Sequence, residues 1–102
     1  DHFCGPDGMF HVYILWSPSL DRHYIGQTGD VHRRVNFHAA HSTPFTARAN
    51  DWQLIFLEPV NTRQEAMALE RRIKRAKNRD AIARFVRNPR NIIQQPIPIS
   101  DW

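Results

Sequence analysis

The sequence predicts a single mixed α/β domain of the α+β type. Three stretches are rich in β-branched and aromatic residues, as strands are, and three others have the apolar spacing of helices. A chain of 102 residues suits one hydrophobic core and leaves little room for a second. Its content of 41% hydrophobic and 24% charged residues is that of a globular protein, so we do not expect a disordered chain.

The first two strands are predicted at residues 9–16 (MFHVYILW) and 22–27 (RHYIGQ). The polar link SPSLD between them is short enough for a hairpin. Gly26 indicates either a bulge or a place where the backbone closely approaches another group. A third strand is predicted at residues 52–58 (WQLIFLE), after the loop sequence STPFTARAND. Trp52, at its start, is expected in the core or at its rim.

The clearest predicted helix covers residues 63–77. Thr62 and Glu65 have the spacing of a capping box, in which side chains satisfy backbone N–H groups of the first helical turn. Apolar residues recur three and four positions apart, so one face is expected to be buried while the arginines stay in water. The members of this stripe are Ala66, Leu69, Ile73 and Ala76.

Two further helices and a tail complete the predicted domain. Asp30 can cap a helix over residues 31–41, and a shorter helix over 80–87 ends before a proline. We expect the domain to cover 9–90, followed by an extended tail over 91–102. Residues 1–8 (DHFCGPDG) show no periodicity, so we interpret them as an added or disordered leader.

The hydropathy and the charge of the chain indicate which kinds of partner it binds. No apolar run approaches the roughly 20 residues needed to cross a bilayer, so we expect a soluble, cytoplasmic protein that does not bind membranes. Residues 63–90 contain ten Lys or Arg against three acids, a net charge of +7, whereas residues 1–62 carry −2. Such a concentration of positive charge suits nucleic acid, although a solvated helix face would have the same composition.

Several residues have the chemistry that phosphodiester hydrolysis needs. Arg34 offers a planar fork of donors for a phosphate, and His38, one helical turn later, can share a proton. Glu70 is an acid among basic residues and could bind a divalent metal through oxygen. The phenols of Tyr13 and Tyr24 can position or deprotonate a water.

The motifs VYIL, YIGQT, R-R-x-x-x-H and E-A-x-x-x-E-x-x-I-K follow one another between residues 10 and 77. Together they resemble the GIY-YIG nuclease superfamily, in particular its small stand-alone bacterial members. These are related to the excision-repair incision domain and to intron homing endonucleases. The resemblance implies a small three-stranded antiparallel sheet flanked by helices. It also implies hydrolysis of DNA with one Mg²⁺ or Mn²⁺, leaving 5′-phosphate and 3′-hydroxyl ends.

The resemblance also implies which residues form the site. It assigns catalysis to four residues, which are Tyr13, Tyr24, Arg34 and His38. Glu70 would bind the metal, and Gly26 would be the glycine of the second half-motif. The first half-motif departs from the family pattern, because His11-Val12-Tyr13 stands where a glycine would come first. Arg34 is preferred to Arg33 because it lies ten residues after the second tyrosine and on the same helix face as His38.

Other basic residues are predicted to hold the DNA backbone outside the site. They are Arg33, Arg48, Arg71, Arg72, Lys74, Arg75 and Lys77. Thr28 and Thr46 are weaker candidates, since polar loop residues need no functional reason. Glu70 has a structural alternative, because its spacing from Lys74 is that of a helical ion pair. The histidines His32, His38 and His41 lack a tetrahedral zinc spacing and a cysteine partner.

The main alternative is a nucleic-acid-binding module on the same scaffold that cuts little or not at all alone. A domain of about 80 residues has little surface for reading a sequence, so a protein partner could provide the targeting. The two hypotheses differ in whether a metal binds near Glu70 and whether DNA is cut.

Overall fold

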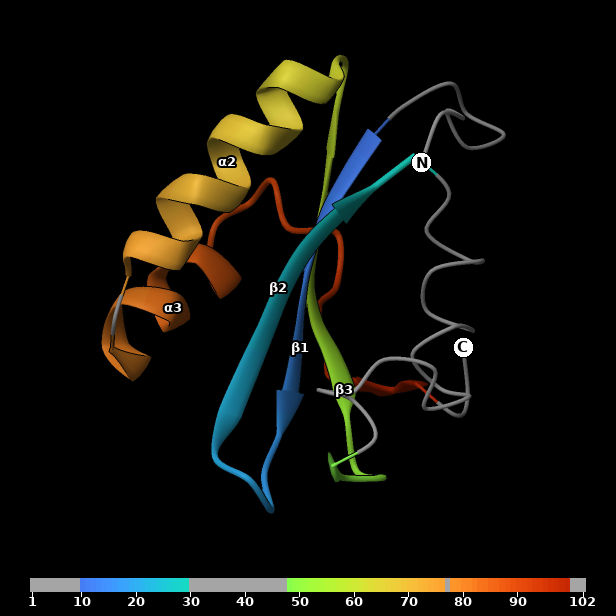
Figure 1. Ribbon diagram of the computed structural model, residues 1–102, viewed down its shortest axis with the longest axis vertical. Coiled ribbons are helices and arrows are strands. Elements are labelled where there is room, and N and C mark those ends of the chain that lie inside the picture. The colour runs from blue at the N-terminus through green and yellow to red at the C-terminus, as the bar shows by residue number, and fades with distance from the viewer. Residues whose placement is uncertain (1–9, 30–47, 77, 100–102) are drawn as a thin grey trace.

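In the computed structural model, which describes residues 10–29, 48–76 and 78–99, two helices cover one face of an antiparallel sheet (Figure 1). The order of strands within these residues is β2-β1-β3-β4. The strands are β1 (Phe10–Ser17), β2 (Arg22–Thr28), β3 (Gln53–Val60) and β4 (Ile97–Pro98). The helices are α2 (Arg63–Arg75) and α3 (Arg79–Val86). The predicted class is confirmed, but the sheet has four strands rather than three because the tail adds β4.

The hairpin of β1 and β2 sets the register of the whole sheet. Tyr13 lies opposite Gly26, and Leu15 lies opposite Tyr24, with no shift along the pair. The irregularity occurs instead between β1 and β3, where the register shifts between Ile14 and Leu15. The continuous pairing of β1 with β2 therefore excludes a bulge at Gly26. Of the two explanations for this glycine, the close approach of its backbone to another group remains.

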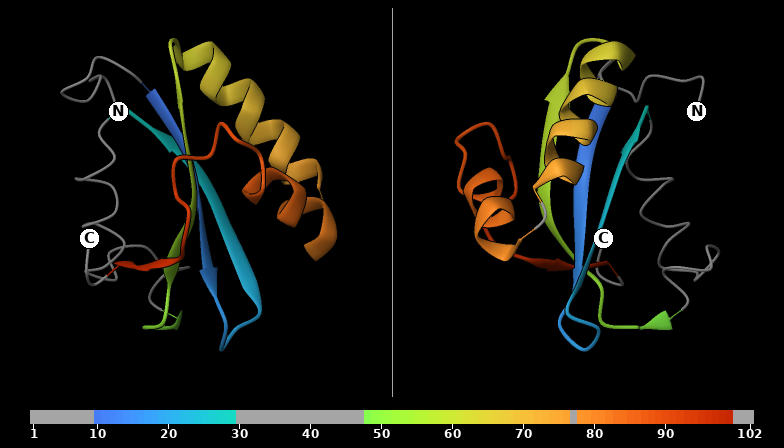
Figure 2. Two further views of the ribbon diagram at one scale, coloured as in Figure 1. Left: turned by 180° about the vertical axis from the view of Figure 1, so that it is seen from behind. Right: turned by 60° about the vertical axis from the view of Figure 1, so that its left-hand side comes forward.

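Apolar residues pack on both faces of the sheet because side chains alternate along each strand. Helices α2 and α3 cover one face of the sheet (Figure 2). On this face, the strand residues Val12, Ile14 and Phe56 form one core with the helices. The helices contribute Ala66, Leu69, Ile73 and Ile82. The opposite face holds a second cluster, with Tyr13, Leu15, Trp52, Leu54, Leu57 and Ile99. Trp52 is 1% exposed, so it is a core residue rather than a rim residue.

The start of α2 forms as the capping box predicts. Thr62 Oγ1 accepts a hydrogen bond from the Glu65 N–H at 3.1 Å, while the Glu65 carboxylate accepts one from the Asn61 N–H at 3.3 Å. The helix ends at Arg75, so the predicted range of 63–77 is too long. Asn78 caps α3, because its Oδ1 accepts a hydrogen bond from the Ala81 N–H at 2.8 Å. In the described ranges, no helix is both long enough and apolar enough to cross a bilayer.

Asn91 joins the chain after α3 to the sheet. Its Oδ1 accepts hydrogen bonds from the N–H groups of Leu57 (2.9 Å) and Ile93 (3.0 Å). Its Nδ2 donates to the carbonyls of Ile55 (3.1 Å) and Val86 (2.8 Å). One side chain, 8% exposed, thus holds β3, the end of α3 and the first part of the tail together.

We expect Asn91→Ala to lower the free energy of unfolding by about 2–4 kcal/mol, because it removes the partners of several buried backbone groups. Urea denaturation would measure the change. Asn88→Ala is the matched control, since the Asn88 side chain makes an exposed bond to the Arg90 N–H at 2.9 Å. The control should cost less than about 1 kcal/mol. Equal effects of the two substitutions would contradict this account of Asn91.

Candidate active site

The β1–β2 hairpin brings the two predicted catalytic tyrosines together. Because Gly26 lies opposite Tyr13 and side chains two residues apart share a face, Tyr24 projects from the same face as Tyr13. Their rings stack with centroids 6.3 Å apart and planes inclined by 21°. Tyr13 is 2% exposed, and Tyr24 is half-buried. The pair thus has one ring fixed in the core and one at the surface.

Gly26 makes room for the phenol of Tyr13. A Cβ atom built on Gly26 would lie 2.5 Å from Tyr13 Oη and 2.7 Å from its Cζ. Real Cβ atoms essentially never come so close to another heavy atom. The phenol therefore crosses directly over the backbone of β2, which places its hydroxyl group at this strand.

Helix α2 supplies the predicted metal ligand. Leu69 and Ile73 are buried against the sheet, which fixes the orientation of the helix, and Glu70 lies between them with its side chain 20% exposed. Lys74 Nζ is 3.2 Å from Glu70 Oε2, so the ion pair that the spacing suggested is present. The carboxylate also lines a pocket with the tyrosines. The ion pair and a place in the site are therefore compatible.

This pocket, which we call the tyrosine pocket, has a volume of about 440 Å³. Its lining comes from both strands of the hairpin and from α2, with Tyr13, His23, Tyr24, Ile25, Gly26, Gln27, Glu70 and Lys74. The structure thus brings together five of the residues predicted from sequence, which are Tyr13, Tyr24, Gly26, Glu70 and Lys74. Arg33, Arg34, His38, Thr46 and Lys77 lie outside the described residues.

The model of the GIY-YIG catalytic domain family matches residues 9–83. The chain belongs to the GIY-YIG family. The match covers most of the chain, including the hairpin, α2 and every residue assigned above to the tyrosine pocket. Membership implies a nuclease that acts on DNA. Searches of curated proteins and of solved structures give no match.

Beside the tyrosine pocket of this GIY-YIG domain lies a basic groove of about 370 Å³. It shares Gln27, Glu70 and Lys74 with the pocket, so the two are continuous. Its other lining residues are Arg63, Met67, Arg71 and Arg75. Three of the residues predicted to hold DNA, namely Arg71, Lys74 and Arg75, therefore lie next to the candidate metal ligand.

The remaining predicted contacts lie elsewhere on the GIY-YIG domain. The Arg72 guanidinium is 5.9 Å from the centre of the Phe85 ring, so it packs between α2 and α3. Arg48 is exposed ahead of β3. Thr28 is 1% exposed within β2, so the interpretation of Thr28 as a loop contact is wrong.

Sequence reasoning did not single out two polar residues of the tyrosine pocket. His23 and Gln27 line it, and they lie on either side of the YIG motif in β2. The only feature of the sequence that could have indicated them is their position beside this motif, because residues next to a motif on an edge strand lie close to the same pocket. No group of three His, Cys, Asp or Glu residues suited to a metal occurs among the described residues.

Proposed function

We propose that this GIY-YIG domain is a metal-dependent endonuclease that hydrolyses DNA phosphodiester bonds, with a role in DNA repair or recombination. The observation that carries the proposal is the meeting of Tyr13, Tyr24 and Glu70 in one pocket that continues into a basic groove. A phosphate in the pocket would have phenols and a carboxylate beside it. The neighbouring backbone would lie along cationic side chains. The resemblance to the excision-repair incision domain motivates the proposed role.

The residues present fit a hard divalent cation held by few protein ligands. Glu70 is the carboxylate in the described lining of the tyrosine pocket. Mg²⁺ commonly takes one or two carboxylates and completes its shell with waters and substrate phosphates, and Mn²⁺ also prefers oxygen ligands. Glu70 would therefore hold the ion. When bound, such an ion supplies positive charge to the phosphate and makes a water more acidic.

Other side chains of the site would position the water, neutralise charge and transfer protons. The Tyr13 phenol, fixed over Gly26, would orient the attacking water, and Tyr24 at the surface would help to position it. From the sequence resemblance, we propose that Arg34 neutralises charge that grows on the phosphate and that His38 supports proton transfer. Lys74 would hold the Glu70 carboxylate in place until the substrate enters.

The experiment that tests the proposal is cleavage of plasmid, single-stranded, flapped and branched DNA in Mg²⁺ or Mn²⁺. We expect cutting of at least one substrate, and its loss in EDTA because Glu70 would have no cation to hold. DNA affinity, measured by anisotropy in EDTA, should fall with salt. If the four cations of the basic groove each meet a phosphate, log K should change with log salt with a slope of about −3 to −4.

Two outcomes would contradict different parts of this proposal. Salt-dependent binding without cutting of any substrate in either metal would contradict the nuclease proposal and favour a module that needs a partner. Cutting that persists in EDTA would contradict the role of the metal while leaving the nuclease in place.

A further inference from the structure

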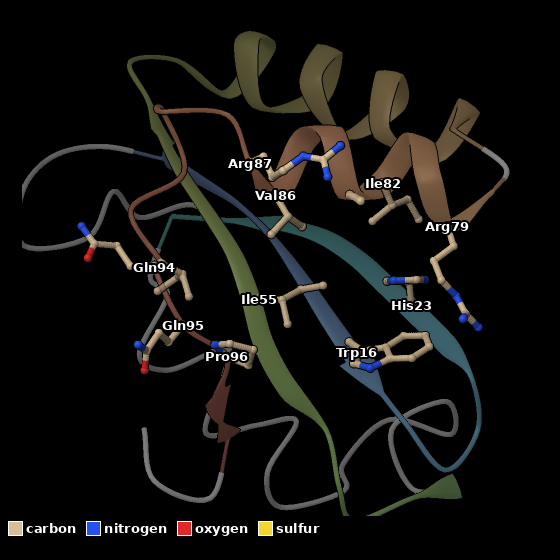
Figure 3. Close-up of a pocket in the computed structure, with 12 residues that line it drawn as sticks. Trp16, His23, Ile55, Arg79, Ile82, Val86, Arg87, Gln94, Gln95 and Pro96 are labelled. Atoms are coloured by element: carbon tan, nitrogen blue, oxygen red, sulfur yellow. The ribbon is translucent and has the colours of Figure 1, made fainter.

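A second pocket opens on the helix-covered face of the sheet, and we call it the ring pocket (Figure 3). Its volume is about 350 Å³. Trp16 of β1 and His23 of β2 form one side, and Ile55 of β3 forms the floor. Ile82 and Val86 of α3 close it from above. Pockets for small ligands measure about 300–1,000 Å³, so this one suits a single small group rather than a peptide.

The walls of the ring pocket favour a flat aromatic group. The rings of Trp16 and His23 lie 4.4 Å apart between centroids, with planes inclined by 33°. Burial lowers the pKa of His23, an effect that Asp21 opposes and Arg79 reinforces, so its imidazole is neutral near pH 7. A neutral imidazole beside an indole extends the aromatic surface and does not attract anions into the pocket itself.

Positive charge lies at the rim. The Arg79 guanidinium is 5.7 Å from the centre of the Trp16 ring and also pairs with Asp21. Arg87, which follows α3, also lines the pocket, and its side chain lies beside that helix (Figure 3). None of the described lining residues is acidic. An apolar interior with aromatic rings on one side and guanidinium groups at its edge is complementary to a nucleotide, whose base is flat and whose phosphate is anionic.

The ring pocket adjoins the tyrosine pocket. His23 lines both, and the next residue, Tyr24, points to the other face of β2. The lining of the tyrosine pocket includes β2 residues of both faces together with Glu70 and Lys74 of α2, so this pocket runs around the edge of the strand and meets the ring pocket at His23. A DNA strand that places a phosphate beside the tyrosines would have a neighbouring nucleotide within reach of the rings.

We propose that the ring pocket receives one unpaired base of the DNA strand whose phosphate enters the tyrosine pocket. This inference rests on the proposed nuclease function and names the class of substrate, which is DNA with an unpaired nucleotide near the cut. In Figure 3 the side-chain amides of Gln94 and Gln95 point away from the rings. The base would therefore be bound mainly by stacking on the aromatic rings and not by hydrogen bonds to its edges, so the pocket accepts any base.

The test measures binding in EDTA, so that cleavage plays no part. Anisotropy compares a duplex that carries one unpaired adenine with the same duplex fully paired. Wild type should prefer the unpaired substrate by roughly 5- to 100-fold, the range for stacking one base on an aromatic side chain. Trp16→Leu should lose this preference, whereas Trp16→Phe, which keeps an aromatic ring, should retain most of it. Arg71→Ala in the basic groove should lower the affinity for both duplexes equally.

A second readout follows the base itself. With 2-aminopurine at the unpaired position, wild type and Trp16→Phe should quench its fluorescence on binding, and Trp16→Leu should not. Thermal unfolding checks that each variant is folded, and if Trp16→Leu is not, the comparison of duplexes on wild type decides alone. Equal affinity of wild type for the two duplexes, or unchanged preference in folded Trp16→Leu, would overturn the inference while leaving the nuclease proposal standing.

Three other outcomes concern the source of the nucleotide and the proposed nuclease function. Free deoxyadenosine monophosphate that competes as strongly as the unpaired duplex would overturn the inference, because the pocket would then be a site for free nucleotides. Absence of binding to either duplex would overturn the proposed function and this inference together. Preference for the unpaired duplex without cutting in Mg²⁺ would support the ring pocket and contradict only the nuclease proposal.

Discussion

Replacing Glu70 with Gln is expected to lower the rate of Mg²⁺-dependent DNA cleavage by about 10²- to 10³-fold. This is the order of loss seen when one group that stabilises transition-state charge is removed. The amide has almost the shape of the carboxylate but lacks its charge, so the divalent cation loses its protein ligand. Since the Lys74 ion pair is partly exposed, its loss should cost less than about 1 kcal/mol of stability. Single-turnover cleavage would measure the effect.

Glu65→Gln is the matched control for this experiment. Glu65 lies in the first turn of the same helix, and glutamine can replace it in the capping box. The control should cleave like wild type. DNA binding in EDTA should remain within a few-fold of wild type for both variants, since neither loses a cationic side chain. Full activity of Glu70→Gln would show that the acid serves only the ion pair.

Among the described residues, local patterns predicted β1, β2, β3, α2 and α3, whereas the predicted helix over 31–41 lies outside them. The first turn of α2 follows from Thr62 and Glu65, whose side chains reach only neighbouring N–H groups. The hairpin follows from two strand-like runs and a short link. Because such features depend on a few adjacent residues, they can be predicted from the local sequence alone.

The parts that sequence reasoning missed depend on contacts between distant residues. Strand β4 exists because Ile97 pairs with Leu54, and beyond it the Ile99 N–H donates to the Trp52 carbonyl at 3.1 Å. The tail was expected to be extended, but its composition did not reveal its partner. The role of Asn91 likewise has no signal in the residues next to it. Its two bonds to Leu57 and Ile55 exist only because β3 lies beside the chain that follows α3.

For the candidate site, the sequence predicted the residues and the structure adds their arrangement. Tyr13, Tyr24 and Glu70 were expected from the resemblance to the GIY-YIG superfamily, and they do line one pocket. The place of His23 between two pockets could not be predicted, because it depends on the position of α3 over the sheet. The roles of Arg34 and His38 remain predictions, as both lie outside the described residues.

The second large effect is expected at Gly26, where an added methyl group would collide with Tyr13. The Cβ atom of Gly26→Ala would lie 2.5 Å from Tyr13 Oη. The ring has little room to withdraw, because it is 2% exposed and packs beside Leu15, Trp52 and Leu57. We expect a loss of about 1–3 kcal/mol in the free energy of unfolding, the usual cost of overpacking.

Cleavage by Gly26→Ala should fall by about 10²-fold even under conditions where the variant is fully folded. A displacement of about 1 Å at a reacting group is enough for such a loss, and the methyl group must move the phenol that orients the water. DNA binding in EDTA should change little, because the basic groove lies on α2. Urea denaturation and single-turnover cleavage, both compared with wild type, separate the effect on stability from the effect on catalysis.

A double-mutant cycle with Tyr13→Phe tests whether the collision is the cause. Phenylalanine lacks Oη but keeps Cζ, which would lie 2.7 Å from the new Cβ, so the strain is relieved only in part. The stability cost of Gly26→Ala should therefore be smaller in the Tyr13→Phe background than in wild type. Strictly additive costs would indicate that alanine disturbs β2 by another route, and the glycine of the motif would then need a different explanation. A non-additive result would tie the glycine of the second half-motif directly to the tyrosine of the first.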